Sequence, residues 1–206
     1  MKPRVFIFTT SYHPFIGGSE VAVQEITKRL KNRFDFYIIT SRFRRNLSKK
    51  EIRPEGTVIR VGFGTKFDKW LLPIWPCPKL SLVQALSQAK LGTIILGVDI
   101  SQGALAAAFY KLFHPKQKFI FNIQYGDGKE RLQKGRLGML SLAFRFILKQ
   151  ADFVTAISTH LADLAKEYGY KGRLEVIPNG VDLQEFRIKN SELRIKNESP
   201  KTIITT

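Results

Sequence analysis

The chain has 206 residues, enough for one large domain or two small ones, and its 44% hydrophobic content is typical of a globular protein. The single cysteine, Cys77, excludes an intramolecular disulfide and a cysteine-based metal cluster, and it favours a reducing, cytoplasmic compartment. No apolar run approaches the ~18 residues that a bilayer span requires. The net charge of +17 (34 Lys and Arg minus 17 Asp and Glu) favours anionic partners, namely nucleic acid, anionic lipid or phosphate-bearing small molecules. A merely solubilising surface is the alternative.

Apolar runs bounded by turn residues alternate with segments of helical periodicity along the first two thirds of the chain. The first elements are a strand at 4–10, a helix at 19–33 with Ser19 as its N-cap, and strands at 34–41 and 57–63, with a basic loop at 42–56 between them. Three prolines exclude regular structure at 70–78. A helix is then expected at 79–90, a strand and turn at 93–103, and a helix at 104–113.

The pattern continues to the last third of the chain. We expect a strand ending in a glycine turn at 118–128, an amphipathic helix at 136–151, a strand at 152–158, a helix closed by Gly169 at 159–169, and a strand and turn at 174–182. Several strands are apolar on both faces, which is typical of a parallel sheet covered by helices on each side. The sequence therefore predicts an α/β fold with a Rossmann-like, doubly wound parallel sheet.

The composition changes near the end of the chain. Residues 1–186 form one predicted domain, 187–200 are polar and charged and are interpreted as a linker, and 201–206 are β-rich. We interpret 201–206 as the first strand of a second domain that this sequence does not contain.

The stretch "SYHPFIGG" at 11–18 joins the first strand to the first helix. Gly17 and Gly18 would tolerate positive φ and allow close approach of a ligand to the backbone, and the helix N-terminus that follows favours an anion such as phosphate. The spacing matches neither a P-loop nor a dinucleotide fingerprint, so a kinase-like or NAD-binding site is unsupported. A purely structural Gly-Gly turn is the alternative.

A second segment makes the pattern more specific. Residues 151–186 contain Ala151-Asp152, Ala156-Ile157-Ser158 and the run Ile177–Asp182 ("IPNGVD"), followed by Phe186. Together with Pro14, Gly17, Gly18 and Glu20 of the first loop, they resemble the N-terminal domain of GT-B glycosyltransferases, in particular the retaining family 4. The resemblance covers essentially the whole chain.

The resemblance implies two Rossmann-like lobes that face a cleft. The N-terminal lobe would bind the acceptor, and the missing C-terminal lobe would hold most of a nucleotide-sugar. Gly17 and Gly18 would contact the donor diphosphate, Pro14 would shape their loop, and His13 in the same loop could reach the cleft. Asn179 is a further substrate-binding candidate, although its place in a turn favours a structural role.

The chain departs from the family pattern at two histidine positions. Gln124 stands where a histidine is frequent, followed by Tyr125 and Asp127, and Gln102 stands at the place of a second histidine motif. Because glutamine does not titrate near neutral pH, Gln124 suits hydrogen bonding to a sugar better than proton transfer. Gln124 and Asp127 are the catalytic candidates, and Tyr125 and Gln102 are substrate-binding candidates. The resemblance implies no metal and no cofactor beyond the nucleotide-sugar substrate.

These observations favour the acceptor-binding domain of a retaining glycosyltransferase that acts on a saccharide or lipid-linked acceptor and is inactive alone. The alternative is a non-catalytic half that needs a separately encoded donor-binding partner. Nucleic-acid binding is disfavoured because the sequence lacks RNP-type aromatics, a helix-turn-helix motif and zinc ligands. Basic and apolar residues combine at 129–150, which allows peripheral binding to an anionic membrane surface; a buried helix with a basic rim is the alternative.

Overall fold

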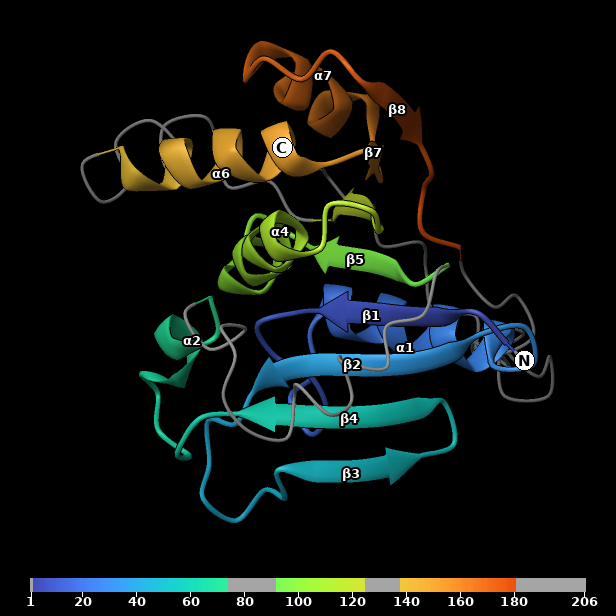
Figure 1. The fold of residues 1–206 in the computed structure, drawn as a ribbon, viewed down its shortest axis with the longest axis vertical. Coiled ribbons are helices and arrows are strands. Elements are labelled where there is room, and N and C mark those ends of the chain that lie inside the picture. Colours follow the sequence, from blue (N-terminus) through green and yellow to red (C-terminus); the bar gives the residue numbers. More distant parts are fainter. Residues whose placement is uncertain (1, 74–91, 125–137, 181–206) are drawn as a thin grey trace, which may run out of the picture.

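The computed structural model describes residues 2–73, 92–124 and 138–180, and a sheet with strand order β3-β4-β2-β1-β5-β6-β7-β8 forms its centre (Figure 1). The β3–β4 pair is antiparallel and the other neighbouring pairs are parallel. The α/β class with a mostly parallel sheet is confirmed. The strands are β1 Arg4–Phe8, β2 Asp35–Ser41, β3 Lys50–Arg53, β4 Gly56–Val61, β5 Ile94–Val98, β6 Lys118–Ile123, β7 Phe153–Ala156 and β8 Arg173–Val176.

Helices cover both faces of this sheet. On β1, Val5 and Ile7 point to one face and pack with Val23 of α1, whereas Phe6 and Phe8 point to the other face and join the core under the later helices. In Figure 1, α1 passes behind β1 and β2. The sheet is therefore doubly wound, as the sequence predicts. The helices are α1 Gly18–Leu30, α2 Asp68–Leu71, α4 Gln102–Phe113, α6 Met139–Gln150 and α7 Thr159–Glu167.

Several helix ends follow directly from residue type. The side chains of Ser101 and Ser158 cap α4 and α7, because each accepts a hydrogen bond from the backbone N–H three residues later. Gly169 adopts φ 95° just beyond α7, which confirms it as the residue that ends this helix. The expectation that Ser19 caps α1 is wrong: the N-cap is Gly17, and no side chain provides the capping hydrogen bond.

Two segments predicted to be irregular contain regular structure. The basic loop expected at 42–56 includes β3, which pairs with β4 so that Arg53 faces Gly56. The prediction that 70–78 has no regular structure is wrong for its first two residues, since Trp70 and Leu71 belong to α2. The predicted helix at 79–90, the linker at 187–200 and the strand at 201–206 lie outside the described residues. Within the described ranges, no helix is long and apolar enough to cross a bilayer.

Candidate functional site

The carboxyl ends of the parallel strands meet at one edge of the sheet, as the arrowheads of β1, β2, β4 and β5 indicate in Figure 1. Ligands of open α/β sheets bind at this edge. Each described site candidate lies in a segment that follows one of these ends. His13, Pro14, Gly17 and Gly18 follow β1, Gln102 follows β5, Gln124 follows β6, and Asn179 follows β8.

The segment after β1 is in direct contact with the start of α4. Thr10 Oγ1 lies 3.4 Å from Gln102 Oε1 and accepts a hydrogen bond from the backbone N–H of Gly103 at 3.1 Å. A Cβ atom on Gly103 would lie 2.5 Å from the carbonyl carbon of Thr9, so only glycine allows this approach. Gln102 is therefore held beside the loop that leads to the two glycines.

Gln124 and Asn179 are brought together although they are 55 residues apart in sequence. Asn179 Nδ2 donates to Gln124 Oε1 at 3.3 Å, and the backbone N–H of Gln124 donates to Asp99 Oδ1 at 3.1 Å. Asp99 has a left-handed backbone (φ 62°), which turns the chain sharply after β5. The contact places two amide side chains, which can both donate and accept hydrogen bonds, side by side at the edge.

The two glycines at the start of α1 do not need positive φ. Gly17 is extended (φ −143°, ψ 174°), and Gly18 is the first helical residue. The tolerance of glycine for positive φ is therefore not used at these two positions, and the close approach of a ligand to the backbone stays a prediction. A Cβ on Gly17 would lie 2.4 Å from Oε2 of Glu20, so glycine at this position leaves room for that carboxylate. A Cβ on Gly18 would meet no atom within 4 Å, and the space in front of Gly18 is open to a ligand.

Glu20 lies in the first turn of α1 and its carboxylate binds the loop. Ser11 Oγ donates to one of its oxygens, and Ser19 Oγ donates to the other at 3.3 Å. A negative charge at this position also complements the partial positive charge of the helix N-terminus. Glu20 thus has a structural role that fixes the start of the loop relative to α1.

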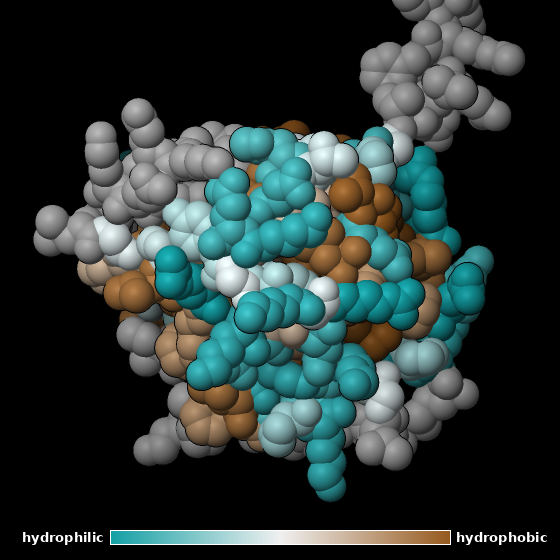
Figure 2. Space-filling view, turned by 90° about the horizontal axis from the view of Figure 1, so that it is seen from above, coloured by the Kyte–Doolittle hydropathy of each residue, from teal (hydrophilic) through white to brown (hydrophobic). Residues whose placement is uncertain are grey.

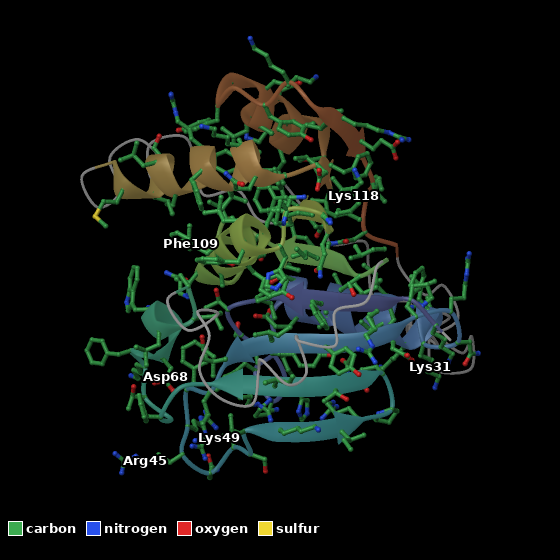
Figure 3. The ribbon with its side chains drawn as sticks, in the orientation of Figure 1. Lys31, Arg45, Lys49, Asp68, Phe109 and Lys118 are labelled. Carbon is green, nitrogen blue, oxygen red and sulfur yellow. The ribbon has the colours of Figure 1, made fainter. Side chains whose placement is uncertain are left out.

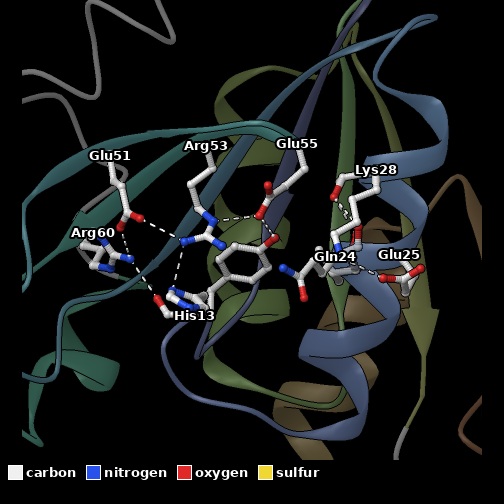
Figure 4. A network of polar contacts seen from close by, with 11 residues as sticks. His13, Gln24, Glu25, Lys28, Glu51, Arg53, Glu55 and Arg60 are labelled. Atoms are coloured by element: carbon white, nitrogen blue, oxygen red, sulfur yellow. Dashed lines mark hydrogen bonds and ion pairs between the residues drawn. The ribbon is translucent and has the colours of Figure 1, made fainter.

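A network of charged side chains fixes the first half of the loop to β3 and β4 (Figure 4). Arg53 Nη1 lies 3.0 Å from His13 Nδ1, and Arg60 Nη2 donates to the His13 carbonyl oxygen at 2.8 Å. Because arginine only donates, Nδ1 of His13 is the acceptor. Glu51 bridges the two arginines, at 3.0 Å from Arg53 Nη1 and 2.6 Å from Arg60 Nη2. The His13–Pro14 peptide bond is cis.

Tyr12 extends this network into the core. Its side chain packs among the α1-face residues, and its hydroxyl donates to Glu55 Oε1 at 3.2 Å, while Arg53 Nε donates to the same oxygen at 2.7 Å. Burial raises the pKa of Tyr12 and the carboxylate of Glu55 raises it further. Burial acts most strongly to raise the pKa of Glu55, but the hydrogen bond and charge of Arg53 together with the backbone and Tyr12 hydrogen bonds outweigh it, and the pKa is lowered. Tyr12 therefore stays neutral and Glu55 ionised near neutral pH.

An apolar cavity opens beside Gln102, between α2, α4 and α6. Its volume is about 120 Å³. Gln102 and Ser101 contribute polar groups at one end, and the remaining lining is apolar: Trp70, Ile100, Leu105, Met139, Leu140, Ala143 and Ile147. The edge therefore combines amide side chains with an apolar recess.

Tyr125 and Asp127 lie outside the described residues. The pattern of the sequence did not point to Thr10, Gly103, Arg53 or Arg60, which position the candidates. For Gly103 a signal exists, because a glycine has no Cβ and is used where another segment approaches the backbone closely. In the described part of the chain, no group of three or more His, Cys, Asp or Glu side chains is placed to hold a metal ion.

Comparison with known proteins gives a consistent result. The family model of Glycosyltransferase Family 4 matches residues 16–185. An uncharacterised glycosyltransferase of Methanocaldococcus jannaschii is 23% identical over 212 residues, covering 96% of this chain and 53% of that protein.

Solved structures give the same picture of the fold. Sucrose-phosphate synthase from Thermosynechococcus elongatus matches with a TM-score of 0.63 at 18% identity, over 89% of this chain and 49% of that chain. A trehalose-6-phosphate structure from E. coli with bound UDP-2-fluoro glucose matches with a TM-score of 0.55 at 12% identity, over 88% of this chain and 50% of that chain. The chain spans about half the length of these relatives. Its fold is that of the N-terminal half of a GT-B glycosyltransferase, and the chain belongs to glycosyltransferase family 4.

Proposed function

We propose that this chain is the acceptor-binding lobe of an enzyme that transfers a sugar from a nucleotide-sugar to a saccharide or lipid-linked acceptor with retention of anomeric configuration. The observation that carries the proposal is the open N-terminus of α1 at Gly17 and Gly18, at the same edge as Gln102 and the Gln124–Asn179 pair. Membership of family 4 supports the reaction class.

The donor diphosphate meets the backbone N–H groups at the start of α1. The first-turn N–H groups of a helix have no intrahelical acceptor and carry partial positive charge, so they suit a phosphate oxygen. A side chain at Gly18 would occupy the space through which the diphosphate approaches. The approach of the diphosphate would explain why position 18 is glycine, although the protein around it leaves room for a larger residue.

The amide side chains at the edge orient the acceptor. Gln102, Gln124 and Asn179 can both donate to and accept from sugar hydroxyls, and Gln124 and Asn179 already hold one another in place. The catalytic assignment of Gln124 and Asp127, and the substrate-binding roles of His13, Pro14 and Tyr125, are part of the same proposal. Transfer also depends on holding donor and acceptor in line, because positioning supplies much of the rate of a two-substrate reaction.

Donor binding requires a second lobe. Because the chain spans about half the length of its relatives, we expect it alone to bind nucleotide-sugars weakly and to turn over little. We place the protein in the cytoplasm, since its one cysteine suits a reducing compartment.

The test is to combine the chain with a donor-binding lobe and to screen nucleotide-sugars by calorimetry, with mass spectrometry of the products. We expect one nucleotide-sugar to bind and to be transferred or hydrolysed, with the anomeric configuration of the product, read by NMR, equal to that of the donor. An inverted product would contradict retention. Binding of donor by the 206-residue chain alone, at the affinity of the two-lobed protein, would contradict the division between the lobes.

A further inference from the structure

Three helices on one face of the sheet expose large apolar side chains to solvent. Leu142 and Met139 of α6 are 68% and 61% exposed, Phe113 of α4 is 62% exposed, and Phe67, directly before α2, is 76% exposed. Trp70 of α2 and Phe109 and Leu112 of α4 are also exposed. In α4 the exposed apolar residues occupy positions 109, 112 and 113, a spacing that places them on one side of the helix.

The helices that carry these residues form one continuous surface, which we call the α2–α4–α6 face. The rings of Phe109 in α4 and Phe146 in α6 pack with their centroids 5.0 Å apart. Trp70 of α2, Leu105 of α4 and Leu140 of α6 line the same apolar cavity. The exposed apolar residues thus belong to neighbouring elements and do not lie singly on the surface. Figure 2 shows apolar and hydrophilic patches alternating along the left flank, the side on which α2 and α6 lie in Figure 1.

The charges on this face are basic. Lys66 and Lys69 lie beside Phe67 and Trp70. Arg145 and Lys149 of α6 lie on its α7 side, where Arg145 is 5.7 Å from the centre of the Tyr168 ring. The one carboxylate in α2, α4 and α6 is Asp68, whose side chain is buried and accepts hydrogen bonds from the backbone of Gly64 and Thr65. Within these three helices, the exposed charges therefore have one sign.

We propose that the α2–α4–α6 face binds the surface of an anionic lipid bilayer. Exposed aromatic and aliphatic side chains insert at the level of the lipid headgroups, and the neighbouring Lys66 and Lys69 bind the anionic headgroups. A nucleic acid would use the cations, but it offers no apolar phase for Leu142, Met139 and Phe113. The net charge of +17 gives the long-range attraction in either case, and the exposed apolar residues favour the bilayer.

The docking has a consequence for the candidate site. The apolar cavity that ends at Gln102 lies between the three helices of this face, so docking holds this part of the carboxyl edge next to the headgroups. An acceptor anchored in the membrane would then present its sugar or phosphate group to the site without leaving the bilayer. This consequence rests on the proposed function, whereas the docking itself does not.

The test measures binding of the 206-residue chain to sedimenting vesicles of phosphatidylcholine, alone and mixed with phosphatidylglycerol. We expect binding to the mixed vesicles that weakens with salt and is much reduced on phosphatidylcholine alone. Replacing Leu142 and Phe113 by Ser should lower the vesicle affinity by about tenfold or more, because it removes apolar side chains that insert into the bilayer. Both side chains are exposed, so we expect the variants to fold. Circular dichroism checks the fold of each variant.

Matched controls separate this face from general charge. The pair K66Q and K69Q and the control pair K31Q and R33Q each lower the net charge from +17 to +15 (17 − 2). In Figure 3, Lys31 lies on the opposite side of the molecule from Phe109. We expect the first pair to weaken vesicle binding by about tenfold or more and the control pair to have a smaller effect. Similarly, I52S removes an exposed apolar side chain of β3 and should change nothing.

Three results would overturn the proposal. The first is equal loss of vesicle binding in the two charge pairs, because total charge alone would then explain it. The second is binding to duplex DNA that exceeds binding to the mixed vesicles and is insensitive to the Leu142 and Phe113 substitutions. The third is a dimer in solution that these substitutions dissociate, because the face would then be covered by a second copy of the chain.

Discussion

Arg60, near the end of β4, donates a hydrogen bond from Nη2 to the backbone carbonyl oxygen of His13 at 2.8 Å. The side chain of Arg60 is almost fully buried, and its Nη1 donates to the carbonyl oxygen of Ser48 at 3.1 Å. Arg60 therefore ties together the segment before β3 and the loop that precedes α1. The conformation of the loop depends on this hairpin, at a distance in sequence of 47 residues.

The first prediction concerns this tie. Replacing Arg60 by Met should lower the free energy of unfolding by about 1–3 kcal/mol, because it leaves the carbonyl oxygens of His13 and Ser48 without their donor and removes the ion pair with Glu51. Chemical denaturation measures the change. The control is Arg29→Met, which removes an exposed i,i+4 pair with Glu25 and should cost less than about 0.5 kcal/mol. Equal effects of the two substitutions would contradict the anchoring role.

The second prediction concerns the contact between α4 and the end of β1. Gly103→Ala should destabilise the protein by about 1–3 kcal/mol, although alanine is the better helix former, because its Cβ would lie 2.5–2.7 Å from backbone atoms of Thr9 and Thr10. Thermal unfolding measures the sign of the change. A more stable variant would show that the loop and α4 are not packed as described.

The third prediction concerns pH. Burial acts to raise the pKa of Asp152, but hydrogen bonds from Lys111 Nζ at 2.8 Å and the Phe119 N–H at 2.7 Å outweigh it, and the pKa is lowered. A carboxyl whose pKa is lower in the folded than in the unfolded state stabilises the fold above its unfolded pKa of about 4, and this contribution is lost as pH falls. Asp152→Asn should therefore reduce the fall in unfolding free energy between about pH 5 and pH 2.

The measurement for Asp152 is a series of denaturation curves across that pH range. Glu51, Glu55 and Asp68 also have lowered pKa values, so the variant should keep part of the pH dependence. An unchanged slope would mean that Asp152 has the same pKa in the folded and unfolded states.

The fourth prediction concerns the amide pair. Gln124→Ala and Asn179→Ala should each lower kcat/KM for the acceptor in the two-lobed enzyme, and the double variant should lose less than the sum of the two, because each residue holds the other. Kinetic measurement of the four proteins gives the coupling free energy, which we expect to be about 0.5–2 kcal/mol. Additive losses would mean that the two side chains act independently.

The sequence predicts elements whose pattern is local. β1 is recognisable because four consecutive residues, Val5–Phe8, are apolar, and the end of α7 is recognisable because Gly169 follows the last helical turn. β3 is not recognisable from the sequence, since "KEIR" has two basic residues and one acidic residue. Its strand conformation depends on pairing with β4 and on the Glu51–Arg60 ion pair. Ser19 fails as a cap for a local reason, because the helix begins one residue before it.

The candidate site shows the same division. The motif around Gly17 and Gly18 and the "PNG" run are visible in the sequence, and the topology explains why both lie at the carboxyl edge. The contacts of His13 with Arg53 and Arg60 involve separations of 40 and 47 residues, and no spacing rule connects them. Of the two properties of glycine that the sequence suggests for Gly17 and Gly18, positive φ is not used, and close approach of a ligand stays a prediction; the open space before Gly18 is a three-dimensional feature that the sequence does not show.

The central claim is that the amides at the start of α1 meet the donor diphosphate. The most direct measurement is calorimetric titration of the two-lobed enzyme with its nucleotide-sugar, comparing the wild-type protein with Gly18→Val. We predict an affinity lower by about tenfold or more, with thermal stability close to wild type because a Cβ at this position meets no atom within 4 Å. Undiminished affinity in the folded variant would contradict the claim.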